Sequence, residues 1–177
     1  MTAVYPLIER IAEQICTRIE AVQIANNYQV DVAEVLRPTR IGNVGDLNFV
    51  PKDLLAVVEQ GPCVTAVEEV GNSNPNTKQR EQVFYIGLYR LCSKADTVPI
   101  DRKLNVFIAD VEMALTLGKT PGANWQQFIQ EDDSHLAVNS RLADPQYFSL
   151  IEHQAAGATV QFAVTYRHPV SDPYTVA

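Results

Sequence analysis

The sequence predicts an α+β fold, in which an antiparallel or mixed β-sheet carries two main helices packed on one face. Two stretches have apolar residues at helical spacing, and the other apolar segments show the alternation or the short continuous runs of strands. Strands do not alternate regularly with helices, which favours an antiparallel or mixed sheet over a parallel one. The 177 residues, of which 46% are hydrophobic and 20% charged, are typical of one globular domain. We therefore expect residues 1–177 to form a single domain.

The two helices are expected at residues 4–26 and 99–118. In the first, apolar residues recur at three-to-four spacing and most charged residues fall on the other side. Asn26-Asn27 is expected to end this helix, because asparagine tolerates the left-handed conformation of a C-cap. The second helix has a wide apolar stripe and is expected to stop at Gly118.

Two strands are expected after the first helix. Residues 29–36 predict one of them, and the continuous apolar run at residues 54–58 predicts a buried strand that Gly61-Pro62 ends. Residues 39–53, rich in Gly and Asn, predict an extended loop between the two. Irregular loops of this length usually have a function, so we expect this loop, and a second polar loop at residues 71–80, to bind partners.

Residues 63–70 and 81–92 are expected to pair as a long protruding β-hairpin, with the extended loop at residues 71–80 as its tip. The second arm is apolar on both faces, since Tyr85 and Tyr89 share one face and apolar residues also line the other. Such a strand must be covered on both sides. The cover comes either from helices of the same subunit or from a neighbouring subunit.

A second hairpin is expected from residues 146–153 and 158–168, with its turn at residues 155–157. From residue 160 to residue 166, apolar and polar residues alternate, which is typical of an antiparallel strand with one solvated face. Residues 169–177 contain two prolines and are expected to form an extended C-terminal arm.

The composition excludes several classes of protein. A net charge of −7 argues against a protein that grips DNA, because such binding depends on clustered Lys and Arg. The sequence has no run of about 18 apolar residues, so no transmembrane helix is expected. Residues 1–10 lack the pattern of a secretory signal. The odd number and long spacings of Cys16, Cys63 and Cys92 predict free thiols in a reducing cytosol rather than a disulfide framework or a zinc site.

The sequence predicts no catalytic or cofactor-binding residues. Residues 118–120 resemble the end of a phosphate-binding loop, but they close a helix, and the carbonyl end of a helix repels phosphate. The acidic run at residues 131–135 lacks the alternating oxygen ligands of a calcium loop, and no spacing brings His153 or His168 to it. We interpret the run as a solvated loop. The alternative is a small metal-dependent enzyme with the ligands Asp132, Asp133 and His135.

These features favour a protein that binds other proteins. Trp125 is a lone indole beside a polar loop, which suits a partly buried anchor at a domain edge or at a subunit interface, where tryptophan is enriched. The tyrosines of the doubly apolar arm lack the interleaved basic residues of a nucleic-acid surface, which favours a core or interface role. The candidate interface residues are Tyr85, Tyr89, Arg90, Asn74, Asn76, Lys78, Trp125 and Arg167.

Four segments together carry a family resemblance. They are the helix at residues 7–22, the central hairpin with its polar tip, the helix at residues 104–115, and the strand at residues 160–168 followed by Ser171-Asp172-Pro173. In this order they resemble the small α+β tail-terminator proteins, a family of tail-completion or neck proteins of long-tailed bacteriophages. The resemblance spans most of the chain.

The resemblance implies a structural virion protein that has no active site and needs no cofactor. It implies a homo-oligomeric ring of six subunits that caps the tail tube and joins it to the neck connector. DNA would pass through the ring without being held, and an acidic lining suits this role because it repels phosphate. The protein would be made in the host cytoplasm and would reside in the tail or neck. A head-completion or stopper protein, or another minor tail protein, is the alternative in the same class.

Overall fold

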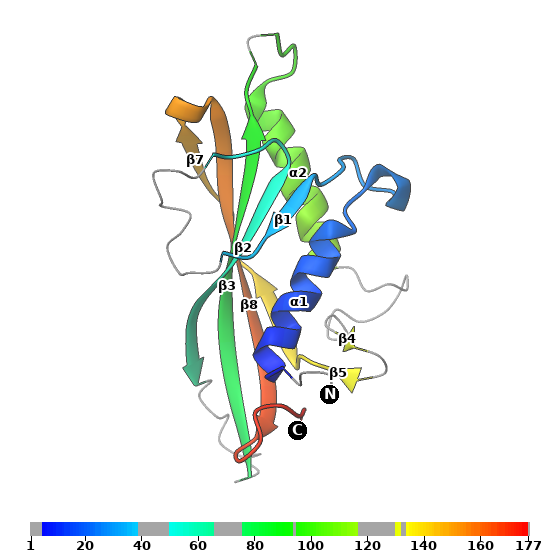
Figure 1. The fold of residues 1–177 in the computed structure, drawn as a ribbon, viewed down its shortest axis with the longest axis vertical. Coiled ribbons are helices and arrows are strands. Elements are labelled where there is room, and N and C mark those ends of the chain that lie inside the picture. The colour runs from blue at the N-terminus through cyan, green and yellow to red at the C-terminus, as the bar shows by residue number, and fades with distance from the viewer. Residues whose placement is uncertain are drawn as a thin grey trace.

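The part of the chain that the computed structural model describes is an α+β structure. This part comprises residues 5–38, 50–65, 76–93, 95–116, 130–131 and 134–176. It contains two α-helices and a mixed six-stranded sheet, with a separate two-stranded sheet beside them (Figure 1). The predicted fold class is confirmed.

The main sheet has the strand order β1-β2-β3-β8-β6, and β7 also pairs with β8. β1 is parallel to β2, whereas the other neighbours are antiparallel. In chain order the elements are α1 (Leu7–Glu20), η1 (Ile24–Asn26), β1 (Glu34–Leu36), β2 (Leu55–Thr65), β3 (Thr77–Leu91), α2 (Ile100–Thr116), β4 (Gln130–Glu131), β5 (Ser134–His135), β6 (Asn139–Leu142), β7 (Gln146–Leu150), η4 (Ile151–His153) and β8 (Ala155–Pro169).

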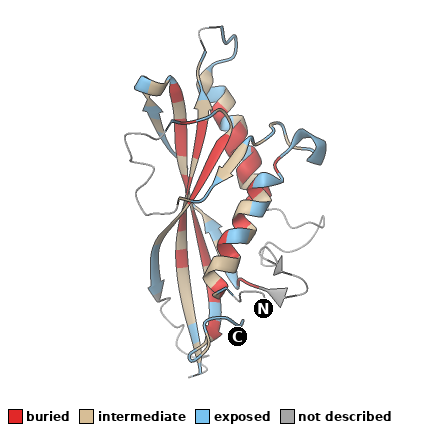
Figure 2. Cartoon of the chain, in the orientation of Figure 1, coloured by how far each residue is buried: buried red, intermediate tan, exposed pale blue. Residues whose placement is uncertain are grey.

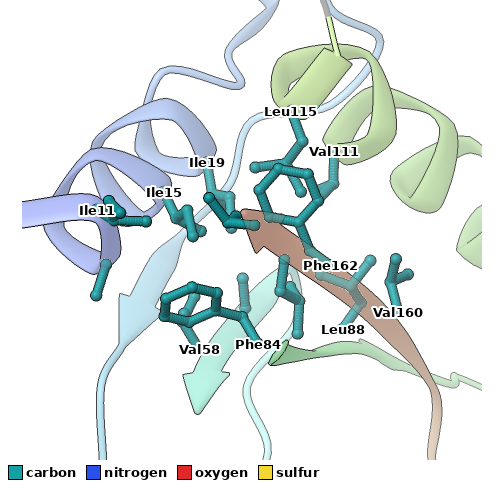
Figure 3. Packing of buried hydrophobic residues seen from close by; sticks show 14 of the residues in the cluster. Ile11, Ile15, Ile19, Val58, Phe84, Leu88, Val111, Leu115, Val160 and Phe162 are labelled. Carbon is teal, nitrogen blue, oxygen red and sulfur yellow. The ribbon is translucent and has the colours of Figure 1, made fainter. Parts of the chain in front are cut away.

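Both helices lie on the same face of the sheet, and the main core fills the space between (Figures 1 and 2). Ile11, Ile15 and Ile19 of α1 point down onto the sheet, because a spacing of four residues keeps them on one side of the helix (Figure 3). Phe84 of β3 and Phe162 of β8 rise from the sheet to meet them and are fully buried. Each such side chain contributes about 1.5–3 kcal/mol through burial.

α1 is shorter than the predicted helix at residues 4–26. It ends at Glu20, and the left-handed residue Asn27 (φ 69°) closes the separate 3-10 turn η1 instead. The carboxylate of Asp31 accepts a hydrogen bond from the Ile24 amide at 2.7 Å and holds this turn. α2 lies within the predicted range 99–118, of which residues 117–118 are outside the described part of the chain.

β1 is also shorter than the predicted strand at residues 29–36. The amides of Gln29 and Val30 donate to the carboxylate of Asp110 on α2, at 2.6 and 2.9 Å, and not to a neighbouring strand. The side chain of a helix residue therefore replaces the first part of the sheet pairing, and β1 begins at Glu34.

The prediction that Gly61-Pro62 ends a strand is wrong, because β2 runs through both residues to Thr65. The pairing with β3 shifts between Gln60 and Cys63, which is a β-bulge. The buried side-chain amide of Gln82 donates through Nε2 to the Gly61 carbonyl at 2.7 Å and so replaces a regular sheet bond. Proline, which lacks an N–H group, is accommodated at such an irregularity. β2 and β3 pair as antiparallel neighbours, but the predicted loop at residues 71–80 was too long, because β3 begins at Thr77 and contains residues 77–80. Residues 66–75 lie outside the described residues, so the protruding hairpin stays a prediction.

The predicted pairing of β7 with β8 is confirmed, but the turn between them was misplaced. It consists of η4 and the left-handed residue Gln154 (φ 50°), and residues 155–157 already belong to β8. The alternation from residue 160 to residue 166 is confirmed, since the apolar residues there are buried and the polar residues between them are not. The C-terminal arm returns to the start of α1, where the Leu7 amide donates to the Pro173 carbonyl at 3.0 Å.

Candidate functional site

The face of the sheet that lies opposite α1 and α2 carries a second, smaller set of apolar side chains. Leu55, Val57 and Tyr89 are buried there and pack with Phe148 and Leu150 of β7. We define the opposite face by the residues that point to this side from the three central strands: Leu55, Val57, Glu59, Tyr85, Gly87, Tyr89, Gly157 and Thr159. The doubly apolar arm of the sequence is therefore covered on one side by the helices of its own chain and on the other side in part by β7.

A shallow hollow of about 180 Å³ lies at the centre of the opposite face. Gly87 forms its floor and is paired with Val57 on one side and Thr159 on the other. Because glycine has no side chain, the ring of Tyr89 can lie close to the backbone at this position, and the rings of Tyr85 and Tyr89 both line the hollow. Glu59 completes the lining.

Glycines also fix the position of the aromatic rings around the hollow. A Cβ atom at Gly61 would collide with the ring of Tyr85, so this ring lies across the β-bulge of β2. A Cβ atom at Gly157 would collide with the ring of Phe148 in the same way. Phe148 in turn meets Tyr89 edge-on, with ring centroids 5.7 Å apart. The backbone therefore holds both tyrosines at defined places.

The hollow is electrostatically negative at Glu59. Burial raises the pKa of Tyr89 to about 12, and the nearby negative charge of Glu59 adds to this rise. The Oε1 atom of Glu59 is buried and has no hydrogen-bond partner among the described residues. A buried carboxylate oxygen without a partner is costly, so a bound group that donates a hydrogen bond to the Glu59 carboxylate would offset part of this cost.

The structure places the predicted interface residues at several different sites. Tyr85 and Tyr89 come together at the hollow. Arg167 lies on the same side of the sheet but near the far end of β8, where its Nε donates to Gln79 at 2.6 Å. Arg90 has a side chain that is only 12% exposed, and it forms an ion pair with Asp53 at 3.3 Å.

The remaining predicted residues lie away from the hollow or outside the described chain. Lys78 and Asn76 are exposed at the end of β3, and the Asn76 carbonyl accepts a hydrogen bond from the Val170 amide. Asn74 and Trp125 are outside the described residues, as is most of the loop at 39–53.

Sequence reasoning missed four of the six residues that line the hollow: Val57, Glu59, Gly87 and Thr159. Two signals were present in the sequence. Glu59 directly follows the apolar run at residues 54–58, and Gly87 interrupts an otherwise apolar strand. A glycine inside a strand often marks a close approach of another group.

The acidic run at residues 131–135 is not a loop throughout, because Glu131 belongs to β4 and Ser134 and His135 to β5, which pair with each other. Asp132, Asp133 and the side chain of His135 lie outside the described structure. Among the described residues, no three His, Cys, Asp or Glu side chains gather as a metal site. His153 and His168 stand at opposite ends of β8, and His168 is buried.

The three cysteines are free thiols, and burial raises the pKa of Cys16 to about 11, which keeps it protonated at neutral pH. Neither described helix is long and apolar enough to cross a membrane.

The sequence matches no protein-family model, and no curated protein is significantly similar to it.

Proposed function

We propose that this chain is a structural assembly protein that contacts other protein subunits through the opposite face, and that it is the ring-forming tail terminator of a long-tailed phage. The observation that carries the proposal is the concentration of aromatic side chains around an open hollow on the side of the sheet away from both helices. Aromatic residues at a partly exposed apolar surface are enriched in protein interfaces. The particular role, a cap on the tail tube that joins it to the neck connector, is drawn from the family resemblance.

Exposed apolar residues on the same strands support a contact surface. Val64 at the end of β2 is 50% exposed and Leu91 at the end of β3 is 38% exposed. β1 is the outermost strand in the sheet order and has only three residues. A neighbouring subunit related by rotation could pair with such an edge, and a rotation that closes produces a ring without free edges.

The net charge of −7 supports the proposed passage of DNA through the ring. A conduit with a negative field repels phosphate and lets the duplex slide, whereas clustered Lys and Arg would hold it.

The replacement Tyr85→Asp tests the contact surface. Tyr85 is only partly buried, so we expect the variant to fold and to lose self-association, because it places a charge in the interface. The control is Tyr5→Asp, since Tyr5 is exposed and does not belong to the opposite face. Circular dichroism checks folding, and sedimentation velocity over a range of concentrations measures association. Equal association of the Tyr85→Asp variant and the wild type would contradict the proposed surface, and loss of folding would identify Tyr85 as a core residue.

A further inference from the structure

The hollow on the opposite face has the chemistry of a site for a cationic group. Its one charged side chain is Glu59, whose buried Oε1 has no hydrogen-bond partner among the described residues. The rings of Tyr85 and Tyr89 border the same space. The faces of aromatic rings carry negative potential and attract cations within about 6 Å. An anion, in contrast, would be repelled both by Glu59 and by the ring faces.

The shape of the hollow favours a flat group that enters from solvent. Gly87 leaves room for the ring of Tyr89, since a Cβ atom at this position would lie 3.2 Å from that ring. The volume of about 180 Å³ is several times the roughly 30 Å³ that one water occupies in the liquid. A guanidinium is planar, stacks on aromatic faces and donates two parallel hydrogen bonds to a carboxylate, whereas an ammonium does neither.

We propose that this hollow is a docking site for an arginine side chain carried by a partner protein. The guanidinium would stack against the ring of Tyr85, which is only partly buried, and donate to the carboxylate of Glu59, whose Oε1 has no hydrogen-bond partner among the described residues. Thr159 on the rim is positioned to contact the stem of the arginine. The arginine is assigned to a different protein, and a second copy of this chain is an outcome that the test distinguishes.

This inference rests on the proposed use of the opposite face as a contact surface, but it does not depend on a ring. Its test is therefore carried out with a short peptide and the whole chain. The probe is the capped tripeptide acetyl-Ala-Arg-Ala-amide, and the matched control replaces arginine with citrulline, which keeps the shape and removes the charge. Titration is followed by two-dimensional NMR of the backbone amides at residues 57, 59, 85, 87, 89 and 159.

We expect the arginine peptide to cause saturable shifts at these amides and the citrulline peptide to cause none. Glu59→Gln should weaken binding by about tenfold or more, because it keeps an oxygen acceptor but removes the negative charge that pairs with the guanidinium. The control Glu152→Gln removes the same charge from the exposed turn η4 and should leave the affinity unchanged. Gly87→Ala is a second variant that occupies the floor of the hollow and should also weaken binding.

Several outcomes would overturn the arginine site. Shifts that do not saturate, shifts that citrulline reproduces, or equal binding by the Glu59→Gln and Glu152→Gln variants would each do so. Self-association that depends on Glu59 in the absence of peptide would assign the hollow to a second copy of this chain. If the peptide does not bind while Tyr85→Asp still abolishes association, the arginine site is wrong and the proposed contact surface stands.

Discussion

Asp110 shows how much of the local structure depends on single polar side chains. It is buried on α2, and one of its carboxylate oxygens accepts hydrogen bonds from the amides of Gln29 and Val30. These bonds attach the segment between η1 and β1 to the helix. The segment satisfies its backbone amides in this way before it reaches the sheet.

Replacement of Asp110 by alanine should lower the free energy of unfolding by about 2–4 kcal/mol, because two amides lose an ionised acceptor. Asp110→Asn keeps one side-chain oxygen as an acceptor and should lose less. Chemical denaturation of both variants measures the difference. Asp144→Ala is the control, since Asp144 is exposed and its loss should change stability by less than about 0.5 kcal/mol. A similar loss in the Asp110 and Asp144 variants would contradict the role assigned to Asp110.

The raised pKa of Tyr89 gives the protein a dependence on alkaline pH. Burial, with Glu59 as the second cause, raises the pKa from 10.0 to about 12 in the folded chain. Below pH 10 the tyrosine is protonated in both states, and its contribution to stability is fully present. Between pH 10 and about 12 the unfolded chain loses the proton first, so stability falls as the pH rises through this range.

Tyr89→Phe should therefore flatten the decline of stability between pH 10 and 12 relative to the wild type. Denaturation curves at several pH values in this range measure the slope for both proteins. Other groups titrate in the same range, so the comparison between the two proteins is the informative quantity. Identical slopes would show that Tyr89 does not titrate differently in the two states.

At the residue scale, the sequence predicted which side chains share a face of the sheet, but not which residues they contact. Alternation along the strand placed Tyr85 and Tyr89 on one side, because the period of a strand is two residues. The role of Asp110 could not be predicted, since its partners are backbone amides about 80 positions away. The place of Glu59 in the hollow depends on the register of β2 against β3, which local patterns do not fix.

At the scale of elements, β7 and β8 are joined by an aromatic contact that a glycine permits. Phe148 of β7 lies over Gly157 of β8 and meets the edge of Tyr89 on β3. The contact links three strands across the opposite face. Any side chain at residue 157 would displace the ring of Phe148 from Tyr89.

Gly157→Ala should destabilise the protein by about 1–3 kcal/mol, as is typical when atoms are forced into a packed site. Phe148→Ala should also be destabilising, because it removes the ring contact. The double variant should be more stable than the sum of the two losses predicts, by about 1 kcal/mol or more, since the collision is then absent. Chemical denaturation of the four proteins measures this coupling. Strict additivity would contradict the contact.

The elements with a regular pattern were predicted well, and the irregular joints between them were not. The stripes of α1 and α2 and the alternation in β8 follow directly from periods of 3.6 and 2 residues. The sequence predicted the end of a strand at Gly61-Pro62, where the structure has a bulge. The side-chain amide of Gln82 that stabilises this bulge is 21 positions away in the sequence, so local patterns do not indicate it. The turn before β8 was predicted too late in the sequence, because Gly157 is of a residue type that is common in turns. In the structure Gly157 lies within β8 and leaves room for the ring of Phe148.

At the scale of the whole molecule, the two long strands β3 and β8 organise the structure. They pair over 15 positions, from Thr77 with Pro169 to Leu91 with Ala155. All other strands of the main sheet attach to one of these two directly or through β2. The fold class could be predicted from the order of elements, but the parallel attachment of β1 could not, because it joins segments on either side of the loop at residues 39–53.

Within the described part of the chain the two faces of this sheet are covered unequally, and the proposed function rests on that inequality. The two α-helices pack on one face, whereas the described residues of the opposite face form a small apolar cluster and the hollow at Gly87. A surface of this kind is suited to contacts between subunits.

The most direct test of the proposed function is electron cryo-microscopy of phage particles that contain this chain, at the junction of tail tube and neck. The account predicts a closed ring of six copies, in which the opposite face of each subunit lies against a neighbouring subunit or another tail protein. The Tyr85→Asp variant, supplied in place of the wild type, should be missing from this position, whereas Tyr5→Asp should be present. A single copy at the junction, absence of the chain from the particle, or a ring whose opposite faces all point to solvent would contradict the account.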